Sequence, residues 1–447
     1  MFEGFEMQTT IAFTTLGCKV NQVETEQFKE AFNILGYQVV SFEQKADIYI
    51  INTCTVTHVS DRKSRSLVRR AARLNPGAWL VVTGCMAQIL AEQVAQIAPV
   101  HLIIGNGRKD SLPQIVHEAF RAEAGMPPSE PKIMMADSRQ PEPLATICYQ
   151  KRHLRTRAFV KIEDGCESFC TFCIVPQARG RVRSKCPENI LKELIQLVSL
   201  GYSEAVLTGI HIGQYGADLV DWNLASLLRY LLDNLPVSGF SIRLGSIEPL
   251  EISASFRQLI AVESRICRHF HIPLQSGSKA ILKAMHRRYS PEDYRELIFA
   301  LHEDFPDAAL AADVMIGFPG ETDEDFQATY DLIADLPLTD LHVFKYSRRP
   351  GTPASNFPDQ ISEAVKNVRS DILLKLAQNK KKTFLEKFIG RSIEVLVEQI
   401  KHDQQYLGIS DNYIEVEIIS EKKLSAGEKK VVYCTEVQEE KILGRIV

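Results

Sequence analysis

DGCESFCTFC, residues 164–173, is the stretch of this 447-residue chain that decides the fold. Its cysteines have the spacing CxxxCxxC and are Cys166, Cys170 and Cys173. A short loop with these offsets, and with the aromatic Phe172 before the last cysteine, can wrap three thiolates around one face of a [4Fe–4S] cubane without supplying a fourth ligand. A zinc knuckle would need a second pair, and Cys186 is the only nearby candidate. The loop therefore predicts a cluster with one open iron, directly after an apolar strand at 158–163.

Alternating strands and helices follow this loop. Strand-like runs recur at 205–208, 240–244, 269–272, 311–316 and 341–344, with helical stretches between them. Together with the strand at 158–163 they make six β/α units, which predicts a partial parallel barrel. Such barrels bind ligands at the carboxyl ends of their strands. The candidate binding residues at those ends are Thr208, Gly209, Ser246, Glu248, Gln275 and Ile316, with His211 as a further pocket candidate.

The first 120 residues show a second parallel α/β pattern. Strands are expected at 11–15, 47–52, 79–83 and 101–104, and each of the first three is followed closely by a cysteine: Cys18, Cys54 and Cys85. The carboxyl ends of parallel strands share one edge of the sheet, so these thiols should meet there. Three thiolates suit a second open [4Fe–4S] cluster. The alternative is a zinc site with His58 as the fourth ligand.

Charge points to local rather than general contacts with nucleic acid. The net charge is −4, from 52 Lys and Arg against 56 Asp and Glu. The helix expected at 59–73 carries six basic residues against one acidic residue, and 151–185 carries nine against three. The residues expected to contact RNA phosphates in these two regions are Arg62, Arg65, Arg179, Arg181 and Arg183.

Composition also restricts the location of the chain. No run of about 18 apolar residues is present, which argues against a membrane span. The N-terminus lacks the basic region of a signal peptide. We therefore expect a cytoplasmic protein with reduced thiols. Four cysteines have no partner pattern and are expected to be structural: Cys148, Cys186, Cys267 and Cys434.

Proline and strand patterns predict the domain boundaries. Five of the twenty prolines lie within 123–143, which is typical of a linker. Five short strand-like runs near the C-terminus predict a small closed β-barrel. The fold class is therefore α/β, with four parts: an N-terminal parallel α/β domain at 8–122, a linker at 123–150, a partial (β/α)6 barrel at 151–375, and a basic connecting helix with an OB-like barrel at 376–447. Residues 391–447 carry eight basic and eleven acidic side chains, so few phosphate contacts are expected there.

The cysteine loop resembles the signature of the radical S-adenosylmethionine superfamily, in which the open iron binds S-adenosylmethionine. Almost the whole chain resembles the methylthiotransferases of that superfamily, which have an N-terminal three-cysteine domain, a radical barrel and a C-terminal barrel called TRAM. The motifs that carry the resemblance lie at 15–22, 52–57, 83–85, 164–173, 179–184 and 271–277. GCKVNQ at 17–22, NTCTVT at 52–57 and DRKSR at 61–65 resemble the branch that modifies threonylcarbamoyladenosine in tRNA.

The resemblance implies two [4Fe–4S] clusters, one at each cysteine triad, and two molecules of S-adenosylmethionine per turnover. The barrel cluster would cleave S-adenosylmethionine to a radical that removes hydrogen from adenine C2, and the N-terminal cluster would carry the sulfur. No catalytic residue beyond the clusters is expected, since side chains chiefly position such cofactors. The residues expected to contact S-adenosylmethionine are Phe172, Thr208, Gly209, Ser246, Glu248, Gln275 and Ile316.

The resemblance also implies partners. These are the tRNA anticodon stem-loop, modified at C2 of N6-threonylcarbamoyladenosine 37, a flavodoxin-like external electron donor and a sulfur source. A monomer without a membrane partner is expected. One alternative changes the substrate to N6-isopentenyladenosine in tRNA or to a ribosomal protein. Another is a non-catalytic iron–sulfur or zinc protein that binds RNA and senses redox state.

Overall fold

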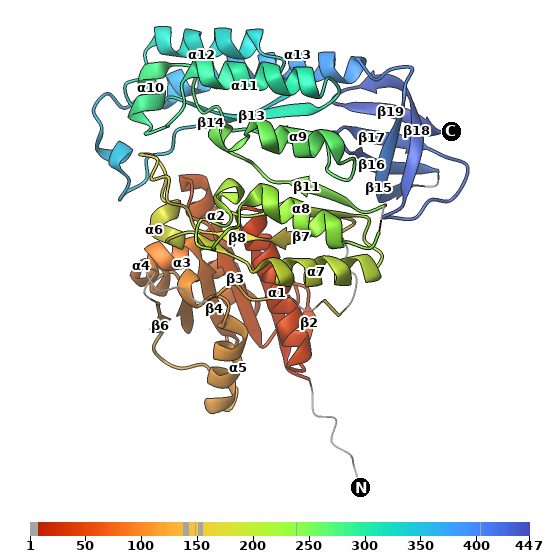
Figure 1. Cartoon of the computed structure of the whole chain (residues 1–447). Helices are drawn as coiled ribbons and strands as arrows, with labels where there is room; N and C mark the ends of the chain where they lie inside the picture. Colours follow the sequence, from red (N-terminus) through yellow and green to blue (C-terminus); the bar gives the residue numbers. More distant parts are fainter. Residues whose placement is uncertain (1–7, 137–142, 148, 151–154, 238, 403) are drawn as a thin grey trace.

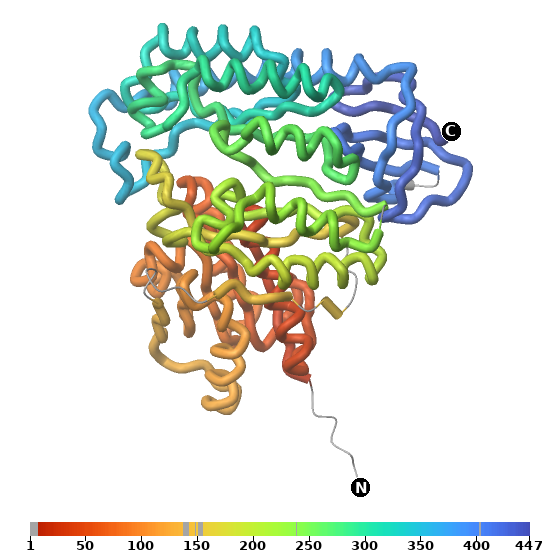
Figure 2. The backbone as a smooth tube through the Cα atoms, viewed as in Figure 1, coloured from red at the N-terminus to blue at the C-terminus, as the bar shows by residue number. Residues whose placement is uncertain are grey.

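The computed structural model describes residues 8–136, 143–147, 149–150, 155–237, 239–402 and 404–447. Three regions pack against one another (Figure 1): an N-terminal sheet domain, a central barrel and a small C-terminal barrel. The backbone trace in Figure 2 shows the N-terminal domain beneath the central barrel and the C-terminal barrel beside it. The expected α/β class with these three parts is confirmed. Among the helices of the described residues, none is long and apolar enough to cross a membrane.

The N-terminal domain is built on a parallel sheet with the strand order β2–β1–β3–β4–β5–β6. Its strands are β1 (Thr10–Thr15), β2 (Gln38–Val40), β3 (Ile48–Thr53), β4 (Trp79–Gly84), β5 (Leu102–Ile104) and β6 (Lys132–Met134). Its helices are α1 (Lys19–Ile34), α2 (His58–Leu74), α3 (Cys85–Ile89), α4 (Ala91–Ala95) and α5 (Leu112–Ala122), with the 3₁₀ helix η1 (Asn106–Arg108) after β5. Every residue of β3 and β4 is buried, as expected for central strands that are covered on both faces.

The segment expected as a linker, 123–150, differs from that expectation. It contributes β6, which pairs in parallel with β5 and places Ile133 opposite Ile103. Lys132-Ile133-Met134 contains no proline, so its backbone can donate to the open edge of β5, while prolines flank it on the N-terminal side. Residues 137–142 and Cys148, which belong to the same segment, lie outside the described residues.

The central domain is a partial parallel barrel. Its strands follow chain order in two three-stranded sheets: β7 (Ala158–Lys161), β10 (Glu204–Thr208) and β11 (Ser241–Leu244), then β12 (His269–His271), β13 (Ala309–Ile316) and β14 (Asp340–Lys345). A bridge between Ile242 and Ile266 and a 3.0 Å hydrogen bond from Ile247 N to His271 O join the two sheets. The edges of the barrel are therefore β7 and β14. The six β/α units expected from the sequence are confirmed.

Helices cover the outer face of this barrel. They are α7 (Pro187–Ser199), α8 (Leu224–Asn234), α9 (Ala254–Val262), α10 (Lys279–Ala284), α11 (Pro291–Asp304) and α12 (Asp323–Asp335). The short helix α6 (Val175–Arg179) instead packs against α3 and η1 of the N-terminal domain. Short elements complete the domain: β8 (Glu163–Asp164), β9 (Arg183–Ser184), η2 (Ile212–Gln214), η3 (Pro249–Glu251) and η4 (Pro353–Asn356). Alternation along β13 separates the two faces, because Leu310, Ala312 and Val314 join the apolar core while Asp313 points to the interior.

The C-terminal barrel closes the amino-terminal end of the central barrel. Helix α13 (Glu363–Glu386) leads into it, and its closed sheet runs β15–β16–β17–β19–β18. The strands are β15 (Ser392–His402), β16 (Gln405–Ser410), β17 (Glu415–Ile419), β18 (Lys429–Gln438) and β19 (Lys441–Ile446). Arg243 of β11 donates to Ser410 O at 3.0 Å and to Asp411 O at 2.8 Å. The ring of Tyr413 stacks on His269, the first residue of β12, at 4.3 Å between centroids.

Candidate active site

The structure brings the N-terminal cysteines together at one edge of the sheet. Cys18 follows β1 and caps α1, Cys54 follows β3, and Cys85 opens α3 directly after β4. Two glycines with positive φ permit this approach, Gly17 at +118° and Gly84 at +97°. A Cβ atom on Gly17 would lie 3.2 Å from the Cβ of Cys54, and one on Gly84 would lie 2.2 Å from the carbonyl oxygen of Thr53. No other residue type fits these two turns.

The second triad lies in the loop between β8 and α6. Backbone hydrogen bonds fix this loop: Cys166 N donates to Gly180 O at 3.1 Å, and Cys173 N donates to Cys170 O at 2.9 Å. His211 Nδ1 lies 3.5 Å from Cys166 Sγ, and Ser168 N donates to the same sulfur at 3.5 Å. Burial alone would raise the pKa of Cys166, but these contacts lower it, so they favour a thiolate at this position. Burial raises the pKa of Cys170 and raises that of Cys173 to about 12.

Each triad offers three thiols, a donor set that a [4Fe–4S] cluster with one open iron can use. Tetrahedral zinc with Zn–S bonds of about 2.3 Å holds its sulfurs roughly 3.8 Å apart. In the described part of the chain, three metal-ligand atoms come within 4.8 Å of one another at His271, Asp313 and His342, and at neither cysteine triad. His58, the proposed fourth zinc ligand, contacts Arg349 instead, at 3.5 Å. The wider ligand set of a cubane therefore fits the thiols better.

Helix α6 links the two triads. It begins two residues after Cys173, and Asn106 Nδ2 donates to Ala178 O of this helix at 2.7 Å. The same amide lies 3.8 Å from Cys85 Sγ, and the positive charge of Arg179 acts on the pKa of Cys18. Both triads therefore border the interface between the N-terminal domain and the central barrel.

A cavity of about 190 Å³ adjoins Cys170 at the carboxyl end of the barrel strands. Glu248, expected near the cofactor, lines it and accepts a 2.8 Å hydrogen bond from Arg287 Nη1. The same nitrogen donates to Cys170 Sγ at 3.6 Å. Sequence reasoning missed Arg287 and Glu251, because Arg287 lies in a charged turn after α10 that carries no periodic signal. His211, which also lines the cavity, pairs with Glu251 at 2.7 Å.

The other residues expected to contact S-adenosylmethionine take varied positions. Thr208 and Gly209 end β10, where a Cβ on Gly209 would lie 2.5 Å from the carboxylate of Glu163. Ser246 is exposed after β11. Gln275 is buried with a left-handed φ of +64°, paired by backbone to Val314.

The two apolar candidates, Phe172 and Ile316, pack in different surroundings. Phe172 is half-buried against an apolar cluster, with the Arg287 guanidinium 6.0 Å from its ring. Ile316 is fully buried in the apolar core of the barrel domain. The expectation that its side chain contacts adenine is wrong in this structure, because the alternation of β13 turns this side chain toward the helices.

Two arginines expected to contact RNA are buried in the domain interface, which corrects that expectation. Arg179 Nη1 donates to Glu24 at 2.9 Å and to Asp164 at 2.8 Å. Arg183 Nη2 donates to Asp164 at 3.2 Å. Lys161 lies 3.4 Å from Glu24, and Lys109 also pairs with this carboxylate. Most of the described basic residues in 151–185 are therefore paired inside the protein. Lys151 and Arg152 lie outside the described residues.

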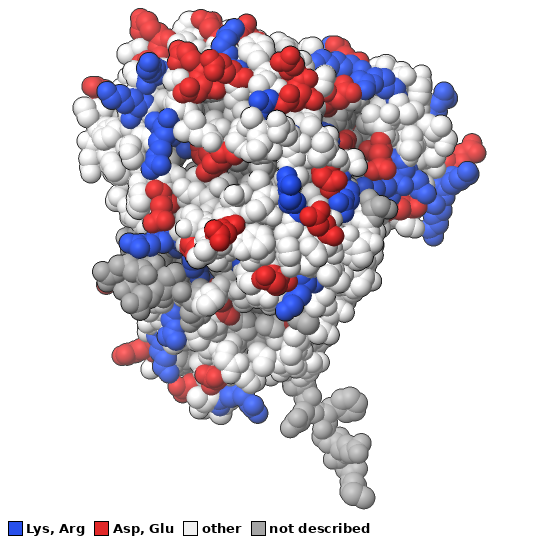
Figure 3. Space-filling model, viewed as in Figure 1, with Lys and Arg blue, Asp and Glu red and all other residues white. Residues whose placement is uncertain are grey.

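Three expected RNA contacts remain accessible. The side chain of Arg181 is 72% exposed, against 1% for that of Arg179. Arg62 is exposed on α2, and Arg65 is half-buried and donates to Gln93 at 2.9 Å. On the face seen in Figure 3, Lys and Arg are interspersed with Asp and Glu, so that face presents no continuous basic surface.

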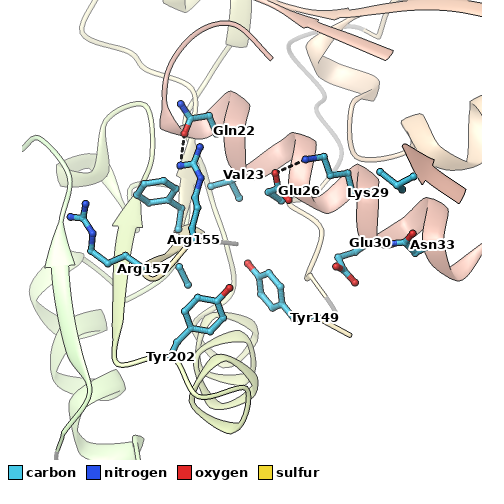
Figure 4. Close-up of a pocket in the computed structure, with 13 residues that line it drawn as sticks. Gln22, Val23, Glu26, Lys29, Glu30, Asn33, Tyr149, Arg155, Arg157 and Tyr202 are labelled. Carbon is cyan, nitrogen blue, oxygen red and sulfur yellow. Dashed lines mark hydrogen bonds and ion pairs between the residues drawn. The ribbon is translucent and has the colours of Figure 1, made fainter. Parts of the chain in front are cut away.

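Further hollows include two that reach helix α1. A groove of about 590 Å³ runs between α1 and β7 and is lined by Arg155, Arg157, Tyr149 and Tyr202 (Figure 4). A cavity of about 300 Å³ lies between the central and C-terminal barrels. Three cysteines without an expected role are separate from both triads: Cys186 contacts Glu188, and Cys267 and Cys434 are buried.

Comparisons with known proteins agree with this architecture. Two family models match the chain, "Uncharacterized protein family UPF0004" over residues 10–105 and "Radical SAM superfamily" over residues 160–333. The chain is 41% identical over 412 residues to the threonylcarbamoyladenosine tRNA methylthiotransferase MtaB of Bacillus subtilis (strain 168), covering 91% of this chain and 90% of that protein. It is 36% identical over 397 residues to the tRNA-2-methylthio-N(6)-dimethylallyladenosine synthase of Moorella thermoacetica, covering 87% of each.

Solved structures support the fold. The radical S-adenosylmethionine methyltransferase TsrM from Kitasatospora setae superposes with a TM-score of 0.60 at 16% identity, covering 78% of this chain and 75% of that chain. Full-length similarity to the curated enzymes, with both cysteine triads in place, confirms the resemblance found in the sequence. The chain therefore belongs to the radical S-adenosylmethionine methylthiotransferases and is a tRNA-modifying transferase.

Proposed function

We propose that the chain transfers a methylthio group to C2 of N6-threonylcarbamoyladenosine at position 37 of tRNA. The observation that carries this proposal is the pair of cysteine sites on either side of α6, each of which supplies three thiols. C2 of adenine is an unactivated C–H, which no side-chain acid or base can replace with sulfur. The substrate follows the relative of 41% identity, which is named for this nucleoside.

The residues of the chain fit the cofactors that the proposal requires. Cys166, Cys170 and Cys173 would hold one [4Fe–4S] cluster, and Cys18, Cys54 and Cys85 a second. Bound there, the clusters and two molecules of S-adenosylmethionine per turnover would supply one-electron chemistry and a sulfur carrier.

Neighbouring side chains favour the thiolate of one cysteine of the barrel triad, Cys166. His211 and Ser168 contact Cys166 Sγ, and these contacts favour its thiolate. Arg287 joins Cys170 to Glu248 through one guanidinium, which fixes that carboxylate at the cavity mouth. The side chains thus position and shield, and the proposal requires no further acid or base.

The proposal also specifies partners. The anticodon stem-loop is the substrate region, and the accessible Arg62, Arg65 and Arg181 are its proposed phosphate contacts. An external, flavodoxin-like electron donor and a sulfur source complete the reaction. A cytoplasmic location follows from the tRNA substrate.

Anaerobic reconstitution tests the proposal. The purified chain should bind about eight iron atoms, four at each triad. With a reductant, sulfide and S-adenosylmethionine, it should convert a stem-loop that carries threonylcarbamoyladenosine to the 2-methylthio derivative, read by nucleoside mass spectrometry. Product only on the isopentenyladenosine stem-loop, or one zinc with no cleavage of S-adenosylmethionine, would overturn it.

A further inference from the structure

The cavity of about 300 Å³ between the two barrels draws on all three regions of the molecule. Lys19 of α1 reaches it from the N-terminal domain, His271 and His342 line it from the central barrel, and Tyr413 lines it from the C-terminal barrel. A cavity with walls from three regions exists only in the assembled protein. Lysines, histidines and carboxylates stand among apolar side chains in its lining, which distinguishes it from a packing defect with apolar walls.

A shared carboxylate orients two histidines of this cavity. Asp313 Oδ1 lies 2.8 Å from His271 Nε2 and 3.2 Å from His342 Nδ1. Burial alone would raise the pKa of Asp313, but these two rings lower it to about 2, so the carboxylate is ionised. Each ring therefore directs one nitrogen to Asp313 and keeps the other, His271 Nδ1 and His342 Nε2, for a ligand.

His269 adds an unsatisfied polar atom beside them. Its ring stacks on Tyr413, and its buried Nδ1 has no hydrogen-bond partner among the described residues. Burial and the neighbouring cations Arg243 and Lys19 lower the pKa of His269, so the ring is neutral. A neutral imidazole with a free nitrogen is a hydrogen-bonding group that awaits a partner.

Lys19 is the cation of this cavity that lacks a carboxylate. Within the described residues, no Asp or Glu lies in ion-pair distance of its ammonium. Lys381, which lines the same cavity, is by contrast paired with Asp340 at 3.5 Å and with Glu440 at 3.0 Å. The three carboxylates that line the cavity, Asp340, Glu440 and Glu415, each lie within ion-pair distance of a lysine. Among the described residues of the lining, Lys19 is therefore the lysine without a carboxylate partner, next to hydrogen-bonding histidines. This combination is complementary to a small anionic ligand that also carries polar groups.

We propose that this cavity binds the N6-threonylcarbamoyl substituent of the substrate adenosine, with the Lys19 ammonium paired to its carboxylate and the free histidine nitrogens bonded to its hydroxyl and urea groups. The inference rests on the proposed function and names its specificity determinants. A dimethylallyl substituent is apolar and uncharged, so it would leave Lys19 and the histidines unpaired. The site thus selects by charge and hydrogen bonding rather than by size.

The position of Lys19 agrees with this assignment. It directly follows Cys18, and consecutive Cα atoms lie about 3.8 Å apart. C2 and C6 belong to the same six-membered ring of adenine, so a base with C2 at the N-terminal triad carries its N6 substituent past the start of α1. The same stretch of chain therefore serves the reacting carbon and the group that identifies the base.

The test compares Lys19→Met with Lys192→Met, which removes an exposed lysine of α7 that lies outside the cavity. Stem-loops with threonylcarbamoyladenosine, isopentenyladenosine or plain adenosine at position 37 are used for two readouts: the Kd with cofactor-free protein and kcat/KM with the reconstituted enzyme. Lys19→Met should lower kcat/KM and affinity for the threonylcarbamoyl stem-loop by about 10- to 100-fold, the range of one charge-assisted hydrogen bond. The other two stem-loops should change less than about threefold, and Lys192→Met should not alter the preference between stem-loops.

Controls separate the possible failures. Iron content and RNA-free cleavage of S-adenosylmethionine report whether Lys19→Met disturbs the neighbouring triad, and Lys19→Arg should restore part of the preference. If Lys19→Met loses cluster iron, the Kd of the cofactor-free protein for the three stem-loops replaces kcat/KM as the test. An unchanged preference for the threonylcarbamoyl stem-loop in Lys19→Met overturns the inference, as does a divalent metal bound stoichiometrically by His271 and His342. If the wild-type enzyme does not modify that stem-loop, the proposed function itself fails.

Discussion

The two cysteine triads are built in opposite ways. Cys166, Cys170 and Cys173 lie in one loop, held by backbone hydrogen bonds within the barrel domain. Cys18, Cys54 and Cys85 come from three separate strands and meet only because β1, β3 and β4 pair in one register, with Asn52 opposite both Thr15 and Thr83. A local triad tolerates distant changes, whereas a triad assembled by a sheet depends on every contact that fixes the strands.

The largest expected effect comes from removing one thiol from each triad. Cys170→Ala should abolish both cleavage of S-adenosylmethionine and methylthio transfer, because both depend on the barrel triad. Cys54→Ala should abolish transfer and leave RNA-free cleavage of S-adenosylmethionine within about twofold. Each variant should lose about four of eight iron atoms. If Cys54→Ala also stops cleavage, the triads are not independent.

The next effect addresses the interface that joins the triads. Burial alone would raise the pKa of Glu24, but Arg179, Lys109 and Lys161 hold it well below its usual range. Glu24→Gln leaves Lys109 without a carboxylate, and leaves Arg179 and Lys161 with Asp164 as their carboxylate partner. It should lower the free energy of unfolding by about 3–5 kcal/mol at pH 7. Urea unfolding measures this loss. The exposed pair of Glu43 with Arg70 gives the control, since Glu43→Gln should cost less than about 1 kcal/mol.

The same pair of proteins gives a pH dependence. A depressed carboxylate pKa contributes stability above the unfolded value and loses it as pH falls through the folded value. The difference between wild type and Glu24→Gln should therefore be full near pH 7 and shrink below about pH 4.5, the ordinary range of a Glu carboxyl. A difference that grows on acidification would contradict the assignment.

Alanine substitutions at glycines near each triad test the two triads one at a time, with a smaller loss in the free energy of unfolding than Glu24→Gln. Alanine at Gly84 would place Cβ 2.2 Å from Thr53 O, and alanine at Gly165 would place it 1.9 Å from Arg181 O. Each should cost roughly 2–4 kcal/mol, and the iron loss should be confined to the N-terminal triad for Gly84→Ala and to the barrel triad for Gly165→Ala. Gly320→Ala is the matched control, because its φ is +80° with no atom within 4 Å, so it should cost about 1 kcal/mol and no iron.

The smallest effect concerns RNA affinity. Arg181→Ala should weaken stem-loop binding a few-fold and reduce the salt slope by about one, as expected for one lost phosphate contact. Arg62→Ala should act similarly, measured by fluorescence anisotropy at several salt concentrations. Arg179→Ala should instead reduce stability, because its guanidinium is buried between Glu24 and Asp164. An unchanged salt slope in Arg181→Ala would remove this residue from the RNA surface.

Sequence patterns predict what depends on local spacing. The cysteine loop, the strands of both parallel sheets and the five strands of the C-terminal barrel all carry such patterns, and all are present. The strands β2 and β6 were missed because strands of three residues hold no periodic signal. Local spacing also does not predict whether a charged side chain is buried or exposed. Arg179 and Arg181 are two positions apart, yet Arg179 is buried in ion pairs and Arg181 is exposed. Arg287, in the cavity beside Cys170, and Lys19, in the cavity between the two barrels, could not be placed from local spacing either. Only the assembled fold brings them to these cavities.

Arg243 ties the C-terminal barrel to the catalytic domain, with consequences for how this enzyme can be divided. One guanidinium spans Glu204 of the central barrel and the carbonyl oxygens of Ser410 and Asp411. A chain shortened before residue 390 would leave Arg243 with Glu204 as its partner, expose Phe384 and Phe388, and open the end of the barrel to solvent. The C-terminal barrel is thus a structural cover for the amino-terminal end of the central barrel, and its removal would uncover buried side chains there.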